Sequence, residues 1–310
     1  MVEDYPKTLL EVESRFSSDE ACRQYLFQLR WPEGFVCPRC GGSKAWQMNR
    51  GLWLCGTCRS QVSVTAGTVF QDSHLPLTVW FQAMWHITSQ KNGVSALGLQ
   101  RVLGLGSYKT AWALLHKLRR AMVRPGRDRL RGTIEVDETY WGGDEQGVRG
   151  RLTEDKALIV VAAEEDGKGI GRIRLRHIPD LSRATLHGFI SESVEPGSTV
   201  RTDGLNAYRE LTGYVHDRQV QRHQPHGEYL LPRVHRVVSL LKRWLLGTHQ
   251  GAIGDEHLNS YLNEFTFRFN RRKSASRGKL FFRLAQQAVR VEPAPFASLS
   301  PARPQSVVVG

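Results

Sequence analysis

The sequence lacks any long hydrophobic run. Its longest apolar stretch, Ala157 to Ala163, has the length of a β-strand and falls far short of the roughly 18–20 residues that a membrane-spanning helix needs. The N-terminus also lacks the basic and then apolar order of a secretory signal peptide. We therefore expect a cytoplasmic protein with no membrane partner.

Acidic residues are fewer than basic ones. The 310 residues include 43 Lys and Arg against 30 Asp and Glu, which gives a net charge of +13. The basic excess is concentrated in two segments, with a local charge of +8 over residues 101–131 and +9 over residues 216–290. In a cytoplasmic protein, such an organised excess favours nucleic acid as the partner.

Cysteine is scarce, yet four of the five cysteines form one pattern. Cys37, Cys40, Cys55 and Cys58 follow the spacing C-x2-C-x14-C-x2-C. Two such turns can complete a tetrahedron of thiolates around a structural Zn²⁺. Two disulfides are the alternative, but they require an oxidising compartment that nothing in the sequence signals, and a redox site would use only one pair. We predict a zinc ribbon.

The chain divides into segments of different periodicity. We expect a helical lead at residues 1–34, the zinc ribbon at 35–70, a helical segment at 77–124, a mixed α/β domain at 131–290 and a disordered tail at 291–310. Within the mixed domain the pattern predicts strands at 133–139, 157–163, 170–177, 198–202 and near 219–220, and helices at 182–193, 205–211, 232–246 and 255–269. The predicted fold class is α+β and multidomain.

The helical segment contains a candidate DNA-binding motif. Two helices are separated by the turn Gly104–Ser107, and the second carries Lys109, Lys117, Arg119 and Arg120. This arrangement resembles a helix-turn-helix. An ordinary helical hairpin with a solvated basic face fits the pattern equally well. The neighbouring ribbon and the local charge of +8 favour contact with DNA.

Two aspartates lie where strands can bring them together. Asp137 is in the first strand after residue 131, and Asp203 ends the later strand 198–202 before Gly204. Carboxylates on neighbouring strands are the hard oxygen ligands that Mg²⁺ prefers, and such a pair can support phosphoryl transfer. The alternative is that each aspartate only caps a turn.

Four ordered blocks carry a resemblance to a known family. They are Val136–Gly143, Thr202–Gly204, Val234–His249 and Tyr261–Arg272. With the cysteine module, they resemble bacterial insertion-sequence transposases that have an RNase H-like catalytic domain, and the sequence is most similar to the ISXO-type group with its N-terminal zinc ribbon. The resemblance covers roughly residues 20–290.

The resemblance implies specific roles for individual residues. Asp137 and Asp203 match the first two metal-binding aspartates of a DDE-type transposase, which uses Mg²⁺ or Mn²⁺. His235 stands where many relatives have the third acidic ligand, seven residues before the motif's Lys242, and Glu264 is the substitute candidate. Mn²⁺ tolerates a nitrogen ligand better than Mg²⁺ does. Lys242 would contact phosphate, or is simply a solvated lysine on a basic helix.

The implied function is transposition. Such an enzyme binds the terminal inverted repeats of its element as double-stranded DNA, cleaves there, and joins the ends to target DNA, generally as a homo-oligomer. Metal-assisted attack by water and then by a 3′-hydroxyl needs no covalent enzyme intermediate, so no Ser or Tyr nucleophile is expected. The alternatives are a non-catalytic DNA-binding protein derived from a transposase, or a metal-dependent nuclease without strand transfer.

Overall fold

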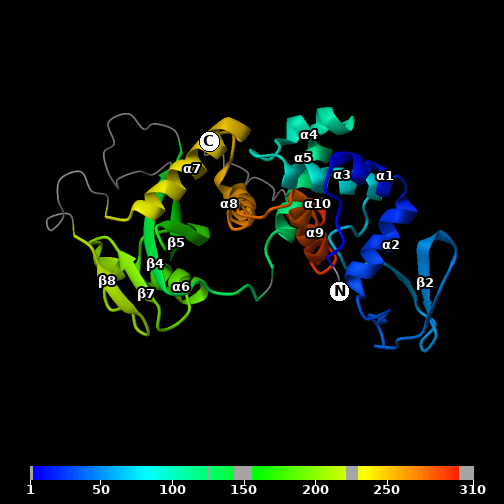
Figure 1. Ribbon diagram of the computed structural model, residues 1–310, viewed down its shortest axis with the longest axis horizontal. Helices are drawn as coiled ribbons and strands as arrows, with labels where there is room; N and C mark the ends of the chain where they lie inside the picture. Colours follow the sequence, from blue (N-terminus) through cyan, green and yellow to red (C-terminus); the bar gives the residue numbers. More distant parts are fainter. Residues whose placement is uncertain (1–2, 125, 143–155, 221–229, 300–310) are drawn as a thin grey trace, which may run out of the picture. The chain divides into compact units, whose positions relative to one another are not determined.

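The computed structural model describes residues 3–124, 126–142, 156–220 and 230–299. The chain separates into two compact units (Figure 1): Met1–Arg124 together with Ser274–Gly310, and Pro125–Lys273. In these described residues, no helix is long and apolar enough to cross a membrane.

The first unit combines a small sheet with helices. Its elements are α1 (Leu9–Arg15), α2 (Asp19–Arg30), β1 (Ala45–Gln47), η1 (Asn49–Gly51), β2 (Leu52–Cys55), β3 (Gln61–Ser63), α3 (Leu77–Ser89), α4 (Ala96–Leu103), α5 (Tyr108–Ala121), α9 (Arg277–Ala288) and α10 (Phe296–Leu299). Strands β1, β2 and β3 pair antiparallel in that order and form the scaffold of the cysteine ribbon.

Helix α9 belongs to this first unit, whereas the sequence placed it in the domain at 131–290. The reason is its apolar face, on which Leu280, Phe281 and Leu284 are buried. Phe281 lies edge-on to Phe81 of α3, with the ring centroids 5.7 Å apart. Because α3 is apolar on most of its circumference, it needs partners on several sides, and α9 supplies one of them.

The expected disordered tail needs a correction for its first part. Residues 291–299 are described, Ala294 is 2% exposed, and Phe296 of α10 lies 6.3 Å from the ring of Trp112 in α5. These apolar contacts order a segment whose proline content suggested a tail. Residues 300–310 lie outside the described part of the chain.

Helices α3, α4 and α5 lie within the segment predicted to be helical, and the turn Gly104–Ser107 separates α4 from α5 as expected. Ser95 accepts a hydrogen bond from the Gly98 N–H and caps α4, while Gly104 ends that helix with a φ of +62°. The expected basic face of α5 is smaller than predicted, because Arg119 is 1% exposed and Lys117 is half-buried. Arg119 follows Leu115 by four residues and therefore shares its buried face.

The second unit is built on one mixed sheet. Its elements are β4 (Thr133–Trp141), β5 (Ala157–Asp166), β6 (Gly169–Ile178), α6 (Arg183–Ser193), β7 (Thr199–Thr202), η2 (Asn206–Tyr208), β8 (Val215–Arg218), α7 (Pro232–His249) and α8 (Asp255–Phe269). The sheet order is β6-β5-β4-β7-β8, with β4, β5 and β6 antiparallel neighbours and β4, β7 and β8 parallel ones. The predicted mixed α/β domain is confirmed.

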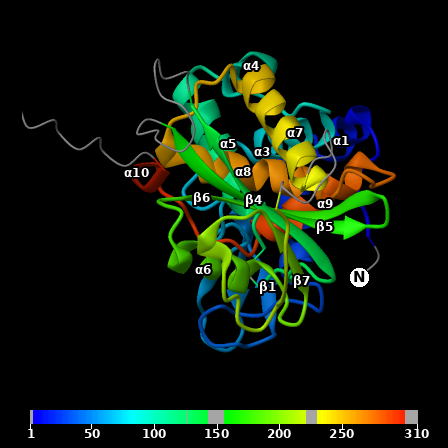
Figure 2. The ribbon, with the colours of Figure 1, turned by 90° about the vertical axis from the view of Figure 1, so that its left-hand side faces the viewer.

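Helices cover both faces of this sheet. Helices α7 and α8 pack against Ile159, Val161 and Trp141 on one face, and α6 packs against Ile134 and Val136 on the other. Figure 2 shows α6 and α7 on opposite sides of the strands. Successive side chains of β4 point to opposite faces of the sheet. The polar residues of β4 with odd numbers therefore face α7.

Two expected elements differ from the structure. The helix predicted at 205–211 is only the short turn η2, because Glu210 adopts a left-handed φ of +60° that ends any helix there. The strand expected near 219–220 lies slightly earlier, at β8.

Helix α8 closes one edge of the sheet. The Asn270 side chain accepts a hydrogen bond from the Ile173 N–H at 2.8 Å and donates one to the Ile173 carbonyl at 3.1 Å. Asn259 accepts another from the His177 N–H at 2.9 Å. These amides take the place of a further strand along β6, which would otherwise offer unpaired backbone groups.

Replacing Asn270 by alanine should lower the free energy of unfolding by about 1–3 kcal/mol, because it strips both partners from a buried backbone position. Urea unfolding followed by tryptophan fluorescence measures this. Asn263→Ala is the matched control, since that half-buried asparagine of α8 makes no hydrogen bond to β6. Equal losses in the two variants would contradict the edge-pairing role.

Candidate metal centres and active site

The four ribbon cysteines converge in space as their spacing predicts. Each Cys-x-x-Cys turn closes on a left-handed residue, Gly41 at a φ of +73° and Arg59 at +59°. The amide of Gly41 bonds the Cys37 carbonyl at 2.9 Å, and that of Arg59 bonds the Cys55 carbonyl at 3.0 Å. These two tight turns aim the four sulfurs at one point.

The spacing of the sulfurs fits a tetrahedral ion. The Sγ atoms of Cys37 and Cys58 are 3.7 Å apart, those of Cys40 and Cys55 are 3.6 Å apart, and all four lie within 4.8 Å of one another. A zinc–sulfur bond of about 2.3 Å in a tetrahedron gives sulfur pairs about 3.8 Å apart. The Ser60 hydroxyl hydrogen bond lowers the pKa of Cys58 to about 6, whereas, against the opposing effect of the Gly42 N–H, the hydrogen bond with Cys58 raises the pKa of Cys40. Cys58 therefore reaches the thiolate form that a metal requires more readily than Cys40.

The register of the sheet brings the two aspartates together. Val136 of β4 pairs in parallel with Thr202, the last residue of β7. One residue further along each strand come Asp137 and Asp203, so they are neighbours. Asp137 accepts a hydrogen bond from the Glu138 N–H and Asp203 one from the Leu205 N–H, both at 2.9 Å, which orients both carboxylates.

A third carboxylate, Glu138, joins this pair. Carboxylate oxygens of Asp137, Glu138 and Asp203 lie within 4.8 Å of one another. The phenol of Tyr208 donates a hydrogen bond to Glu138 Oε2 at 3.1 Å. Tyr208 is the last residue of η2, five residues after Asp203, and its hydrogen bond holds Glu138 beside the end of β7.

Glu138 was missed because strand alternation places it on the face opposite Asp137. The available signal was its position beside Asp137 at the point where β7 stops alongside β4. The hydrogen bond that holds Glu138 comes from Tyr208, 70 positions further along the chain, so the sequence around Glu138 gives no sign of it.

The other predicted site residues lie on the helices. His235 is exposed in the first turn of α7, and Lys242 is half-buried two turns further on. Glu264 is fully buried in α8 and forms an ion pair with Arg268 at 3.3 Å. Among the described residues, the cluster of metal-binding side chains includes neither His235 nor Glu264, so the third-ligand role of His235 stays a prediction.

Burial shapes the chemistry around the cluster. Burial raises the pKa of Tyr208 well above its usual value, and the charges of Glu138 and Asp137 add to the effect. Its phenol therefore stays protonated and acts as a hydrogen-bond donor. Burial also lowers the pKa of Lys242, with a further contribution from Lys156.

The carboxylate cluster fits a hard divalent cation. Neighbouring carboxylates at about 4 Å repel each other by roughly 1–4 kcal/mol per pair, depending on the effective dielectric constant. A divalent cation between them turns this repulsion into attraction, and oxygen donors are the ligands that Mg²⁺ and Mn²⁺ prefer.

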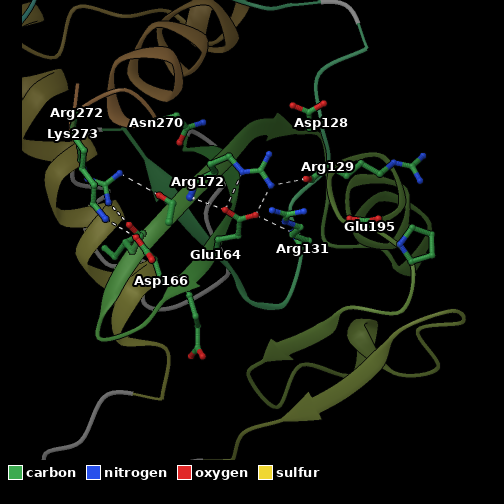
Figure 3. Close-up of a pocket in the computed structure, with 14 residues that line it drawn as sticks. Asp128, Arg129, Arg131, Glu164, Asp166, Arg172, Glu195, Asn270, Arg272 and Lys273 are labelled. Carbon is green, nitrogen blue, oxygen red and sulfur yellow. Dashed lines mark hydrogen bonds and ion pairs between the residues drawn. The ribbon is translucent and has the colours of Figure 1, made fainter. Parts of the chain in front are cut away.

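A wide surface hollow of about 1030 Å³ lies elsewhere, at the start of β4 (Figure 3). Its lining contains five basic and five acidic side chains, so its charges balance. Glu164 pairs with Arg172, and Asp166 pairs with Lys273. The hollow contains none of the clustered carboxylates and has no excess charge to bind a polyanion.

The chain matches two domain families of transposases. Residues 129–270 match the ISXO2-like transposase domain, and residues 17–61 match the transposase zinc-ribbon domain. A ribbon joined to such a domain defines the class as a DDE-type transposase with a zinc ribbon. Within that class, residues 129–270 are similar to the ISXO2-like transposases.

A curated relative agrees with this assignment. The uncharacterized protein in transposable element ISH50 of Halobacterium salinarum is 29% identical over 286 residues, which span 82% of this chain and 91% of the relative. A chain of the simian T-cell lymphotropic virus intasome in complex with PP2A regulatory subunit B56 gamma matches over 68% of this chain and 77% of its own, at 16% identity and a TM-score of 0.31. That TM-score is too low to support an argument.

Purified protein should hold one zinc ion in the ribbon, measured by elemental analysis. Cys40→Ser should lose it and unfold the ribbon, because an open tetrahedron binds far more weakly. Cys22→Ala is the control, since Cys22 is buried in α2, outside the cluster. Full zinc content in Cys40→Ser, or zinc loss in Cys22→Ala, would contradict the assignment.

Proposed function

We propose that this protein is a catalytically active transposase that cleaves DNA at the ends of its element and transfers the strands to target DNA. The observation that carries the proposal is the cluster of Asp137, Glu138 and Asp203 on adjoining strands, inside the segment that matches the transposase domain. The ribbon would bind structural Zn²⁺, and the cluster Mg²⁺ or Mn²⁺.

The reaction proposed is phosphodiester substitution in two rounds. A water oxygen first bonds to phosphorus while the 3′-oxygen leaves and takes up a proton. The oxygen of the freed 3′-hydroxyl then loses its proton and bonds to a phosphorus of the target, while the 3′-oxygen of the cut target strand leaves as a new 3′-hydroxyl. When bound, a divalent ion would activate the attacking oxygen and neutralise negative charge on the phosphate. Asp137 and Asp203 would hold it, and Glu138 would complete the acidic side of the site.

The surrounding residues have supporting roles in this proposal. Tyr208 orients Glu138 by its hydrogen bond, and its raised pKa argues against a role as nucleophile. Lys242 would contact the phosphate. His235 would approach the cluster as a further ligand once DNA and metal are bound.

DNA contact would come from the first unit as well. The first turn of α5 exposes Tyr108 and Lys109, and α4 exposes Arg101 and Val102. In a helix-turn-helix the N-terminal residues of the second helix, here Tyr108 and Lys109, face base edges in the major groove, and the first helix crosses the DNA backbone. Two element ends must be held together during transfer, so we expect a homo-oligomer on DNA.

Cleavage of terminal-repeat DNA in Mn²⁺ tests the proposal. Asp137→Asn and Asp203→Asn should each reduce the rate by about 10²–10⁴-fold, because several kcal/mol of charge stabilisation would be lost. Glu138→Gln should reduce it less, since Asp137 and Asp203 would hold the ion and Glu138 only completes the acidic side of the site. Binding of the same DNA should persist in all three.

Asp166→Asn is the control for this experiment, because that exposed carboxylate pairs with Lys273 outside the cluster. It should cleave at the wild-type rate. Undiminished cleavage by both aspartate variants would remove the proposed site. Cleavage without joining would identify a nuclease, and binding with no cleavage by the wild type would identify a non-catalytic DNA-binding protein.

A further inference from the structure

A buried carboxylate behind the candidate site anchors helix α7 to the strand that carries Asp137. Glu135 is 0% exposed and lies two residues before Asp137 on the same face of β4. Its Oε2 accepts hydrogen bonds from the N–H groups of Arg233 at 2.7 Å and Val234 at 3.0 Å. Both amides belong to the first turn of α7, where intrahelical partners are lacking.

The side chain of Arg233 completes this anchor. Its Nη1 lies 2.9 Å from Glu135 Oε1 and 2.7 Å from Glu165 Oε1. Its Nε and Nη2 donate to the carbonyls of Gly169 and Gly167, each at 3.0 Å. Three interactions therefore hold the N-terminus of α7. They are the ion pairs of Arg233, the favourable alignment of the helix dipole with the Glu135 carboxylate, and the hydrogen bonds of Arg233 to the β5–β6 turn.

The ion pairs continue to the second aspartate strand. Glu165 also pairs with Arg201 of β7 at 2.7 Å, and Arg201 pairs with Asp217 of β8 at 2.7 Å. Glu135 and Arg201 are direct partners in the parallel register of β4 and β7. Each precedes an aspartate of the cluster by two residues. One continuous chain of ion pairs thus lies immediately behind the pair Asp137 and Asp203.

We infer that Glu135, with Arg233, is a positioning residue that sets the register of α7 against the catalytic strands. This inference rests on the proposed function. His235 lies in this anchored turn, directly after Val234, and Lys242 lies two turns beyond it. Loosening the turn would move both side chains relative to Asp137 and leave the cluster itself in place.

Glu164 offers a matched control in the same sheet. Its carboxylate is also buried, accepts hydrogen bonds from two backbone N–H groups, those of Arg131 and Arg172, and pairs with an arginine side chain. It lies beside the start of β4 and holds no part of α7. Replacing Glu164 should therefore destabilise the fold about as much as replacing Glu135, but it should leave the position of α7 unchanged.

The test compares Glu135→Gln with Glu164→Gln in the full-length protein. Hydrogen exchange, measured without metal, should speed up at the first turn of α7 in Glu135→Gln and be unchanged there in Glu164→Gln. In cleavage of terminal-repeat DNA, Glu135→Gln should raise the Mn²⁺ concentration for half-maximal rate, lower kcat, or both. The change should be roughly 10–100-fold, as is typical when a residue that orients metal ligands is replaced. KM for DNA should stay the same.

Arg233→Lys keeps the positive charge but loses the bonds to the β5–β6 turn, so it should give a smaller change in the same direction. If Glu135→Gln fails to fold, Arg233→Lys replaces it as the variant that tests the positioning role. Wild-type exchange and metal dependence in the Glu135 and Arg233 variants would overturn the inference, as would equal catalytic loss in Glu164→Gln. If Asp137→Asn is inactive while Glu135→Gln is normal, only the positioning role fails. Retained cleavage by Asp137→Asn would instead contradict the proposed function.

Discussion

The parallel pairing of β4 with β7 is the constraint from which the candidate active site follows. The register that matches Val136 with Thr202 makes Asp137 and Asp203 neighbours although 66 positions separate them. A shift by one residue would turn one carboxylate to the opposite face of the sheet. Everything that preserves this register therefore preserves the site, including the apolar layers on the two faces.

The charges of the second unit are arranged in layers around that register. The carboxylates of the cluster stand at the end of β7, where a cation is needed to offset their repulsion. Behind them, charges alternate in sign from Glu135 to Asp217, and each carboxylate pairs with at least one of the two arginines, Arg233 and Arg201. Because Glu135 is paired with Arg233, it can be fully buried without a metal. The other members of the inner layer and the three carboxylates of the cluster are partly exposed.

Local spacing and periodicity were enough to predict part of this arrangement. The four ribbon cysteines lie close in sequence, so two short turns bring them together. Asp137 and Asp203 were found because each lies in or at the end of a strand within a block typical of transposases. Helix α8 was predicted at its observed ends because its apolar face repeats regularly over four turns.

The features that were missed depend on contacts between distant parts of the chain. Glu138 joins the cluster through Tyr208, and strand alternation alone points it away. Arg119 is buried because α5 packs into a helical core, which a count of basic residues does not show. Helix α9 pairs with α3 across nearly 200 positions. The anchor from Glu135 to α7 is equally invisible in the sequence, since an acidic residue in a strand gives no sign of its partner.

The most direct test of the account is a crystal structure of the protein with Mn²⁺, in which anomalous scattering locates the ion. The account predicts an ion bound by carboxylate oxygens of Asp137 and Asp203, next to Glu138, with the ion pairs behind them unchanged. An ion bound elsewhere in the second unit, with Asp137 and Asp203 free of metal, would contradict it.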